Sequence, residues 1–299
     1  MHAPLLGFLA ALLTAFCQSA TDLCTKIATR HAEERAILAA QWGAGAALLG
    51  VLCAARHPDL VLHPAAGFAA LTRPQFLPLL ALSGALNLVA YALYVRAYRL
   101  ADASLVAPLI LTTPVLMLVT SPLMTGERIP PLGALGVVLC VFGAGLLGGA
   151  SNGARLSFLS LAREPGARSM LMTAAIWSVT ANLDKLGLRA STPLLWITAV
   201  TMVIALGAVV YWAVSPRRAV RLSDLRHALA AGAANGVGNA VQMYALTLLY
   251  TPYVIAIKRM SSLLTMLLSG LLLNERASGR LLGASVMFAG ALLILFAPQ

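Results

Sequence analysis

Long apolar stretches follow one another along almost the whole chain, and short polar segments separate them. A helix needs roughly 20 apolar residues to cross about 30 Å of hydrocarbon. These stretches reach that length without the alternating pattern of membrane strands. The sequence therefore predicts an all-α membrane protein with ten transmembrane helices, in the approximate bounds 4–28, 36–55, 75–97, 103–124, 131–149, 170–189, 193–214, 227–249, 251–273 and 280–297.

The two halves of the chain resemble each other in sequence. "GALNLVAYA" at 84–92 matches "GAANGVGNA" at 232–240 in five positions, at an offset of 148. Segments 14–26 and 173–185 share Thr, Ala, Ser, Thr and Lys at equal spacing. Because each half holds five spans, the second half must run upside down relative to the first. We predict two inverted five-helix repeats, at 1–150 and 170–299, joined by a linker at 151–169.

Single residues near the ends of the two halves are also identical at equivalent positions. At the offset of 148, Glu127 falls on Glu275, and each residue closes an apolar span. A spacing of seven residues recurs between two glycines of each last span, Gly136 with Gly143 and Gly283 with Gly290. Inverted repeats are typical of secondary transporters, whose substrate site lies near the midplane between the repeats.

The composition supports a membrane protein and excludes several functions. Of the 299 residues, 60% are hydrophobic and 10% are charged, against about 45–50% and about 25% in soluble domains. The net charge of +11 comes mainly from single arginines beside apolar segments, where lipid headgroups and topology account for them, so it indicates no nucleic-acid partner. The sequence holds no P-loop, metal or catalytic-triad motif. We therefore predict no enzyme and no cofactor.

Charged residues inside the predicted spans are few. The three lysines of the chain all lie in spans, whereas of the 18 arginines (21 Lys+Arg less three Lys) only Arg259 lies well inside one. A charge at the membrane centre costs about 2.5–3.5 kcal/mol on insertion scales and usually faces a partner or a cavity. Lys26 and Lys185 have a structural alternative, since Asp22 lies one turn before Lys26 and Asp184 directly precedes Lys185.

The adjacent pair Lys258 and Arg259 has no charged counterpart in the first half, where the offset gives Ile110 and Leu111. The helix scaffold therefore does not need charge at this place. Neighbouring helical residues point about 100° apart. The pair can therefore bind one anionic group, with the compact ammonium group of Lys258 and the planar guanidinium group of Arg259 as hydrogen-bond donors. Four embedded cations, with Lys26 and Lys185, against two embedded acids leave two positive charges in excess, which favours an anionic substrate.

Neutral polar residues complete the predicted substrate site. Asn239, Gln242 and Tyr244 lack full repeat symmetry and are predicted substrate contacts, and Asp22 is a candidate for ion coupling. The predicted site residues are thus Lys26, Lys185, Asn239, Gln242, Tyr244, Lys258 and Arg259, with no metal site. The glycines Gly232, Gly236 and Gly238 are predicted to serve close helix packing.

The two halves resemble the EamA-type families of the drug/metabolite transporter superfamily. Each half has a penultimate span ending in an acidic pair, "MTGER" or "LLNER", followed by a last span with spaced glycines. The resemblance covers nearly the whole chain and implies ten helices in two repeats, a location in the cell (inner) membrane and transport of metabolites. The resemblance implies that both termini lie in the cytoplasm. The arginine count favours the opposite orientation, with the termini outside, because four arginines lie on the side of the termini and thirteen lie on the other side.

A narrower similarity concerns the lysines. Plant-type sugar-phosphate (triose-phosphate) translocators bind phosphate with lysines on the first and sixth helices and a Lys-Arg pair on the ninth. Lys26, Lys185 and the pair Lys258–Arg259 are similar to those positions, although the translocators' tyrosine and histidine contacts have no match. The similarity implies a phosphorylated or carboxylated substrate.

The leading hypothesis is a secondary transporter that moves a small anionic metabolite through the lipid bilayer by alternating access. Its rivals are an EamA-type exporter of amino acids or amphipathic compounds and a lipid-headgroup or polyprenyl-phosphate flippase. A membrane scaffold subunit without transport activity is an alternative from another class. The sequence leaves open the substrate, the direction of transport and the choice between monomer and homodimer.

Overall fold

The computed structural model describes residues 2–28, 31–58, 74–100, 107–149, 164–214, 221–261, 263–264 and 281–298. Within these ranges the chain is helical without strands, and its helices follow the order of the ten predicted spans. The helices are α1 (His2–Ala28), α2 (Glu34–Arg56), α5 (Phe76–Leu100), the 3₁₀ helix η1 (Ala107–Thr112) leading into α7 (Thr113–Thr125), α8 (Pro131–Gly149), α10 (Pro165–Ala190), α11 (Pro193–Ala213), the 3₁₀ helix η2 (Leu222–Leu225) leading into α12 (Arg226–Leu248), α13 (Thr251–Lys258) and α15 (Leu281–Phe296).

Helix α10 begins inside the segment predicted as a linker. Its N-cap is Glu164, whose carboxylate accepts a hydrogen bond from the amide of Ala167 at 2.5 Å, and Pro165 occupies the first turn. Both features favour a helix start. The carboxylate accepts from an amide that has no partner within the helix, and proline has no amide hydrogen that would need a partner. The predicted linker boundary at 169 is therefore wrong, since hydropathy locates the apolar part of a helix and not its capped end.

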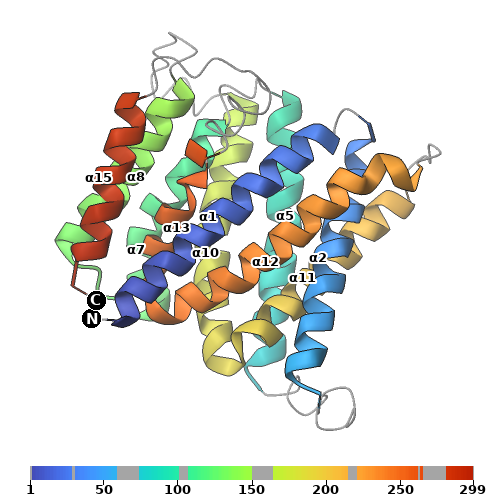
Figure 1. The fold of residues 1–299 in the computed structure, drawn as a ribbon, viewed down its shortest axis with the longest axis horizontal. Helices are drawn as coiled ribbons and strands as arrows, with labels where there is room; N and C mark the ends of the chain where they lie inside the picture. The colour runs from blue at the N-terminus through green and yellow to red at the C-terminus, as the bar shows by residue number, and fades with distance from the viewer. Residues whose placement is uncertain are drawn as a thin grey trace.

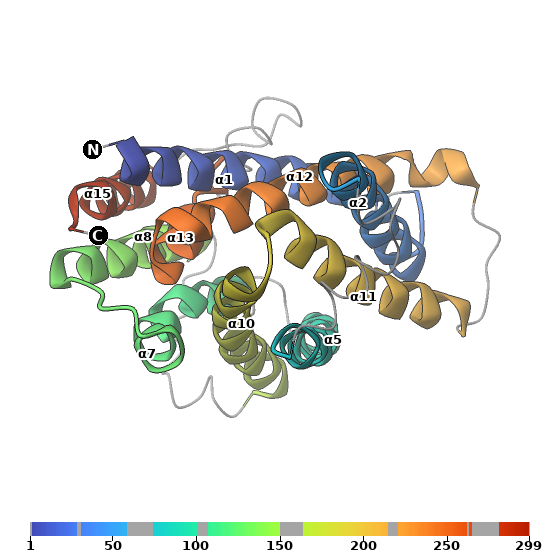
Figure 2. The same cartoon turned by 90° about the horizontal axis from the view of Figure 1, so that it is seen from below.

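The two halves of the chain interleave. Helix α1 of the first half packs along α12 of the second, and α10 of the second packs along α5 of the first. Corresponding helices also meet in pairs, α2 with α11, α7 with α13 and α8 with α15. Figures 1 and 2 show α1 beside α12 and α10 beside α5 in both views. Each half thus contributes to the same bundle instead of forming a separate body.

The recurrent glycines of the last spans make the contact between α8 and α15. A Cβ atom placed on Gly136 would lie 2.7 Å from the carbonyl oxygen of Gly290, and one on Gly143 would lie 2.7 Å from that of Gly283. Real Cβ atoms do not approach a carbonyl oxygen so closely. The spacing seen in the sequence therefore lets the two backbones approach each other directly, as small residues do between membrane helices.

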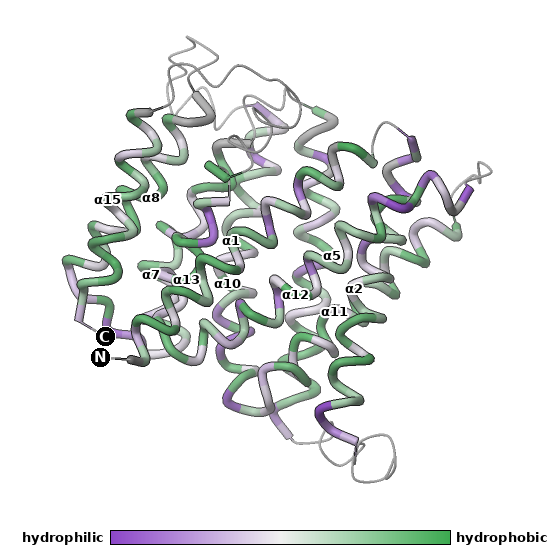
Figure 3. The backbone as a smooth tube through the Cα atoms, viewed as in Figure 1, coloured by the Kyte–Doolittle hydropathy of each residue, from purple (hydrophilic) through white to green (hydrophobic). Residues whose placement is uncertain are grey.

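The outer faces of the bundle are apolar, as lipid requires. Large hydrophobic side chains such as Leu123, Leu206 and Val51 are exposed, and Figure 3 shows α8 and α15 hydrophobic along most of their length. Among the described residues, four helices are long and apolar enough to span a membrane by length and composition, at Ala3–Thr25, Arg35–Arg56, Phe76–Tyr94 and Pro193–Ala213, and shorter apolar helices lie at Leu109–Thr125, Pro131–Leu146 and Leu282–Phe296. Both termini lie at one end of the bundle, the terminal end (Figure 1).

The fourth and ninth helical segments are irregular. The fourth starts as η1 and turns into α7 just before Pro114, which has no amide to donate. In the ninth, α13 ends at Lys258 and residues 259–260 form a turn, so the span predicted over 251–273 is interrupted at this turn. The amide of Met260 donates to the carbonyl of Ile257 at 2.9 Å, a short-range bond that tightens a last helical turn.

Candidate functional site

The predicted pair of cations lies where α13 ends. Lys258 is the last residue of this helix and Arg259 is its C-cap, and both side chains are partly exposed. The free carbonyl groups at a helix C-terminus carry partial negative charge and stabilise cations there. The turn that ends α13 therefore explains physically how two adjacent positive charges are accommodated in an otherwise apolar segment.

Gln242 of α12 is the hydrogen-bond partner of Lys258. The ammonium group of Lys258 donates to the side-chain oxygen of Gln242 at 2.8 Å, and Gln242 itself is buried. Because an amide is neutral, the bond orients the lysine without cancelling its charge. The structure thus brings together two of the predicted site residues from α12 and α13.

Two acids lie within electrostatic range of the cations. Asp22 of α1 attracts both Lys258 and Arg259, and Asp184 of α10 attracts Lys258. The exposed carboxylate of Asp22 accepts a hydrogen bond from Gln18 at 2.8 Å. Asp184 accepts one from the indole nitrogen of Trp196 at 2.9 Å. The cations at the end of α13 thus interact electrostatically with acids of α1 and α10. We call Asp22, Asp184, Gln242, Lys258 and Arg259 the Lys258 site.

Four aromatic rings lie beside the Lys258 site. Tyr91 of α5 makes edge contacts with Trp42 of α2 and Trp177 of α10, with ring centroids 5.3 and 5.5 Å apart, and Tyr94 of α5 lies 5.6 Å from Trp177. Tyr91 is within electrostatic range of Asp184, and Tyr94 is within that of Arg259. This aromatic cluster offers flat apolar surfaces next to charged groups, a combination that suits amphipathic ligands.

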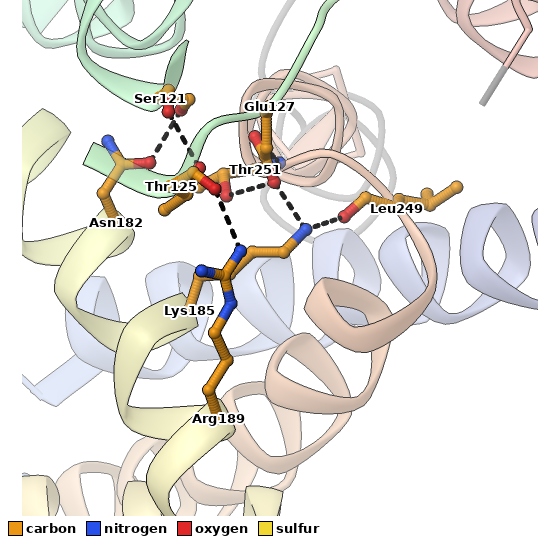
Figure 4. Close-up of polar contacts among 8 residues, drawn as sticks. All are labelled: Ser121, Thr125, Glu127, Asn182, Lys185, Arg189, Leu249 and Thr251. Atoms are coloured by element: carbon orange, nitrogen blue, oxygen red, sulfur yellow. Dashed lines mark hydrogen bonds and ion pairs between the residues drawn. The ribbon is translucent and has the colours of Figure 1, made fainter. Parts of the chain in front are cut away.

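Lys185, the second predicted cation, takes part in a different contact. Its ammonium group forms an ion pair with Glu127 at 2.5 Å and donates to the carbonyl of Leu249 at 2.7 Å. Glu127 is buried, and its two oxygens also accept from the amide of Thr251 at 3.1 and 3.0 Å and from the Thr251 hydroxyl at 3.1 Å. Figure 4 shows Lys185 between Glu127 and Leu249. We call Glu127, Lys185, Leu249 and Thr251 the Glu127 cluster.

The remaining predicted residues are placed as follows. Asn239 lies three residues before Gln242 on α12 and shares its side of the helix, whereas Tyr244, two residues after Gln242, points about 200° away and is 49% exposed. The structure therefore does not bring Tyr244 to the Lys258 site. The backbone of Lys26 belongs to α1, and its side chain lies outside the described part of the chain. The predicted substrate roles of these residues stay predictions.

Comparison with known proteins decides the family. A family model described as the EamA-like transporter family matches residues 5–149 and 165–296. The chain belongs to this family. As an EamA-like transporter of the drug/metabolite transporter superfamily it is an integral membrane protein of the transport class.

One solved structure has the same fold as this EamA-like transporter. It is described only as "Crystal structure of protein" and superposes with a TM-score of 0.80 at 18% sequence identity, over 96% of this chain and 95% of the other. At this identity the likeness concerns the fold alone. No curated protein sequence matches the chain.

Sequence reasoning missed the acid that neutralises Lys185 in this EamA-like transporter. It offered the neighbour Asp184 as an alternative partner of the lysine, but Asp184 bonds Trp196, and Glu127 lies 58 positions from Lys185 in the chain. The available signal was the recurrence of Glu127 at the end of a span, which was interpreted as a boundary and not as a partner. The aromatic cluster was missed as well, because its four rings come from three separate helices.

Proposed function

We propose that this EamA-like transporter is a secondary transporter that moves a small organic anion by alternating access, with the anionic group bound by Lys258 and Arg259. The observation that carries the proposal is the placement of both cations at the C-terminus of α13 with a neutral amide, Gln242, as the hydrogen-bond partner of Lys258. A carboxylate or phosphate group suits such a pair, since Lys offers a mobile donor and Arg a planar fork.

The structure lowers the charge expected for the substrate. Glu127 is paired with Lys185, so it must be counted with Asp22 and Asp184 against the four embedded cations. Four cations and three acids leave one positive charge in excess instead of two. A singly charged group, such as one carboxylate, therefore fits better than a doubly charged phosphate, and the similarity to sugar-phosphate translocators remains a prediction.

The arrangement of the helices supports alternating access. Corresponding contacts recur with the halves exchanged, α1 on α12 as α10 on α5, and α1 on α13 as α10 on α7. This exchange is expected for two inverted repeats, which open on one side of a membrane or on the other by rocking against each other. Substrate that offsets the excess charge would lower the free-energy barrier to that motion.

Uptake of radiolabelled monocarboxylates and phosphate monoesters into proteoliposomes tests the proposal. The double variant Lys258→Ala, Arg259→Ala is expected to lose at least about a hundredfold in transport, because two charge-assisted contacts of about 1.5–3 kcal/mol each disappear. Arg226→Ala, at the start of α12 outside the Lys258 site, serves as control. Unchanged transport in the double variant would contradict the proposal.

A second candidate function is export of amino acids or other amphipathic compounds. The aromatic cluster and Asp184 favour it, because a zwitterion could place its carboxylate at Arg259, its ammonium group at Asp184 and an apolar side chain on Trp177. Competition separates the candidates. An aromatic amino acid that inhibits more strongly than the matching aromatic monocarboxylate favours the exporter, and the reverse order favours the anion transporter.

A further inference from the structure

The Glu127 cluster joins the two halves of the chain at the terminal end of the bundle. Glu127 follows α7 of the first half, after Gly126, whose left-handed φ of 73° ends that helix. Its partners Lys185 and Thr251 belong to the second half, in α10 and at the first position of α13. Every polar contact of the Glu127 carboxylate named above is thus a contact between halves.

The carboxylate also acts as a helix cap supplied from another segment. Both of its oxygens accept from the amide of Thr251, one of the free donors at the N-terminus of α13. A negative charge at this end is stabilised by the helix dipole. Glu127 therefore fixes one end of an eight-residue helix whose other end carries Lys258 and Arg259, about 12 Å away at about 1.5 Å per residue.

A neighbouring contact reinforces the same junction. The guanidinium group of Arg189 on α10 donates to the carbonyl of Thr125 at 2.9 Å, at the C-terminal end of α7. Deeper along the same helix pair, the side-chain nitrogen of Asn182 donates to the Thr120 hydroxyl at 2.9 Å. The side-chain oxygen of Asn182 accepts from the Ser121 hydroxyl at 2.7 Å (Figure 4). A row of polar contacts thus connects α7 to α10, and the Glu127 cluster is where it reaches α13.

We propose that the Glu127 cluster keeps the terminal end of the bundle closed and positions α13, and that it must break when the transporter opens toward that side. The inference rests on the proposed alternating access. Opening at the terminal end separates the halves there, and contacts that bridge the halves at that end cannot persist. Because Glu127 holds α13, its release also frees the helix that carries the Lys258 site.

The experiment measures access to α13 from each side of the membrane. The four native cysteines are replaced by serine, and a single cysteine is introduced at Val254, which is fully buried between Thr251 and Lys258. Its labelling by a membrane-impermeant maleimide is followed in right-side-out and inside-out vesicles. The parent chain is expected to label slowly when the reagent reaches the terminal side.

Glu127→Gln and Lys185→Met remove the ion pair from its two ends. Each is expected to speed labelling from the terminal side by about tenfold, which corresponds to about 1.4 kcal/mol, with no change from the other side. Glu164→Gln is the matched control, because Glu164 also caps a helix with its carboxylate but belongs to the start of α10 and joins no halves. Lys185→Arg keeps the charge and is expected to label as slowly as the parent.

The outcomes separate this inference from the proposed function. Unchanged labelling in both charge-removing variants, or an equal increase from both sides, overturns the closure role of the Glu127 cluster even if the parent transports anions. If the parent transports no anion and the labelling changes as expected, the proposed substrate fails and the closure stands. Thermal unfolding of each purified variant shows which variants are folded, and Lys185→Met tests the closure independently of Glu127→Gln.

Discussion

Lys258 and Arg259 are stabilised by their local structure at the C-terminus of α13. The insertion of a cation at membrane depth costs about 2.5–3.5 kcal/mol of free energy. A helix C-terminus stabilises each cation by about 0.3–1 kcal/mol. Their uncharged equivalents Ile110 and Leu111 lie in η1, which forms a helical turn without any charge at these positions. The remaining cost is therefore not required by the fold, and a substrate that carries negative charge would offset it.

Gln242 provides a sharp residue-level test of that view. In Gln242→Glu, a carboxylate would replace the amide that accepts from Lys258 at 2.8 Å. It would form an ion pair with the ammonium group and compete with the substrate anion. We expect the KM for the anion to rise at least about tenfold, with a smaller change in kcat, as measured by initial rates of uptake into proteoliposomes.

The control adds the same charge at a distance. Ser223→Glu introduces a carboxylate at an exposed position of the 3₁₀ helix η2, so a general effect of net charge on uptake would appear in both variants. A KM that stays at the parent value in Gln242→Glu would mean that Lys258 does not bind the anion.

At the scale of elements, α8 and α15 pack through backbone contacts at glycine. The Cβ positions of Gly136 and Gly290 lie 2.7 Å from the carbonyl oxygen of the opposite glycine. A methyl group at either position requires the helices to move apart. Since van der Waals contact and interhelical hydrogen bonds drive helix association in lipid, such a displacement removes much of what holds the pair together.

Alanine substitution of these glycines measures the effect. Gly136→Ala and Gly290→Ala are each expected to lower the free energy of unfolding by about 1–3 kcal/mol, the usual cost of overpacking. Gly145→Ala is the matched control on the same helix α8, because a Cβ atom there meets nothing within 4 Å. Thermal unfolding in detergent, followed by size-exclusion chromatography, gives the comparison, and equal Tm values for all three variants would contradict it.

At the scale of the whole molecule, arginines mark one end of the bundle. Figure 1 shows the C-terminal ends of α2 and α10 at the terminal end of the bundle, and by sequence Arg56 and Arg189 belong to these helix ends. Arg96, Arg168 and Arg226 belong to the opposite-end parts of α5, α10 and α12. In the sequence the loops on the terminal side hold four arginines and those on the other side thirteen. The positive-inside rule places the richer end in the cytoplasm.

Reporter fusions test this orientation. We expect a C-terminal alkaline phosphatase fusion to be active and a C-terminal green fluorescent protein fusion to be dark, since the termini would face outward. Fusions made after Val214, at the opposite end of the bundle, should give the reverse result. A fluorescent C-terminal fusion would show instead that the orientation implied by the EamA resemblance prevails over the arginine count.

The features that the sequence predicted well are those that can be seen in one segment or by comparing two. The ten helical segments and the EamA family are confirmed, and the recurrent glycines lie in direct contact, Gly136 with Gly290 and Gly143 with Gly283. The start of α10 at Pro165 and the turn that ends α13 at Lys258 were not predicted. A cap and a turn set those boundaries, and both leave little trace in hydropathy.

The sequence by itself therefore determined that the chain is an integral membrane protein, that its halves are related in sequence and that only one half carries the Lys-Arg pair. Tertiary structure alone decided the partners of the charges: Glu127 for Lys185, Gln242 for Lys258, and Trp196 for Asp184. The physical reason is that hydropathy describes one segment and repeat spacing compares two segments, and neither depends on which helices are neighbours in space. The partner of a buried charge depends instead on which helix packs beside it, and here the closest partner of Lys185 comes from the other half of the chain.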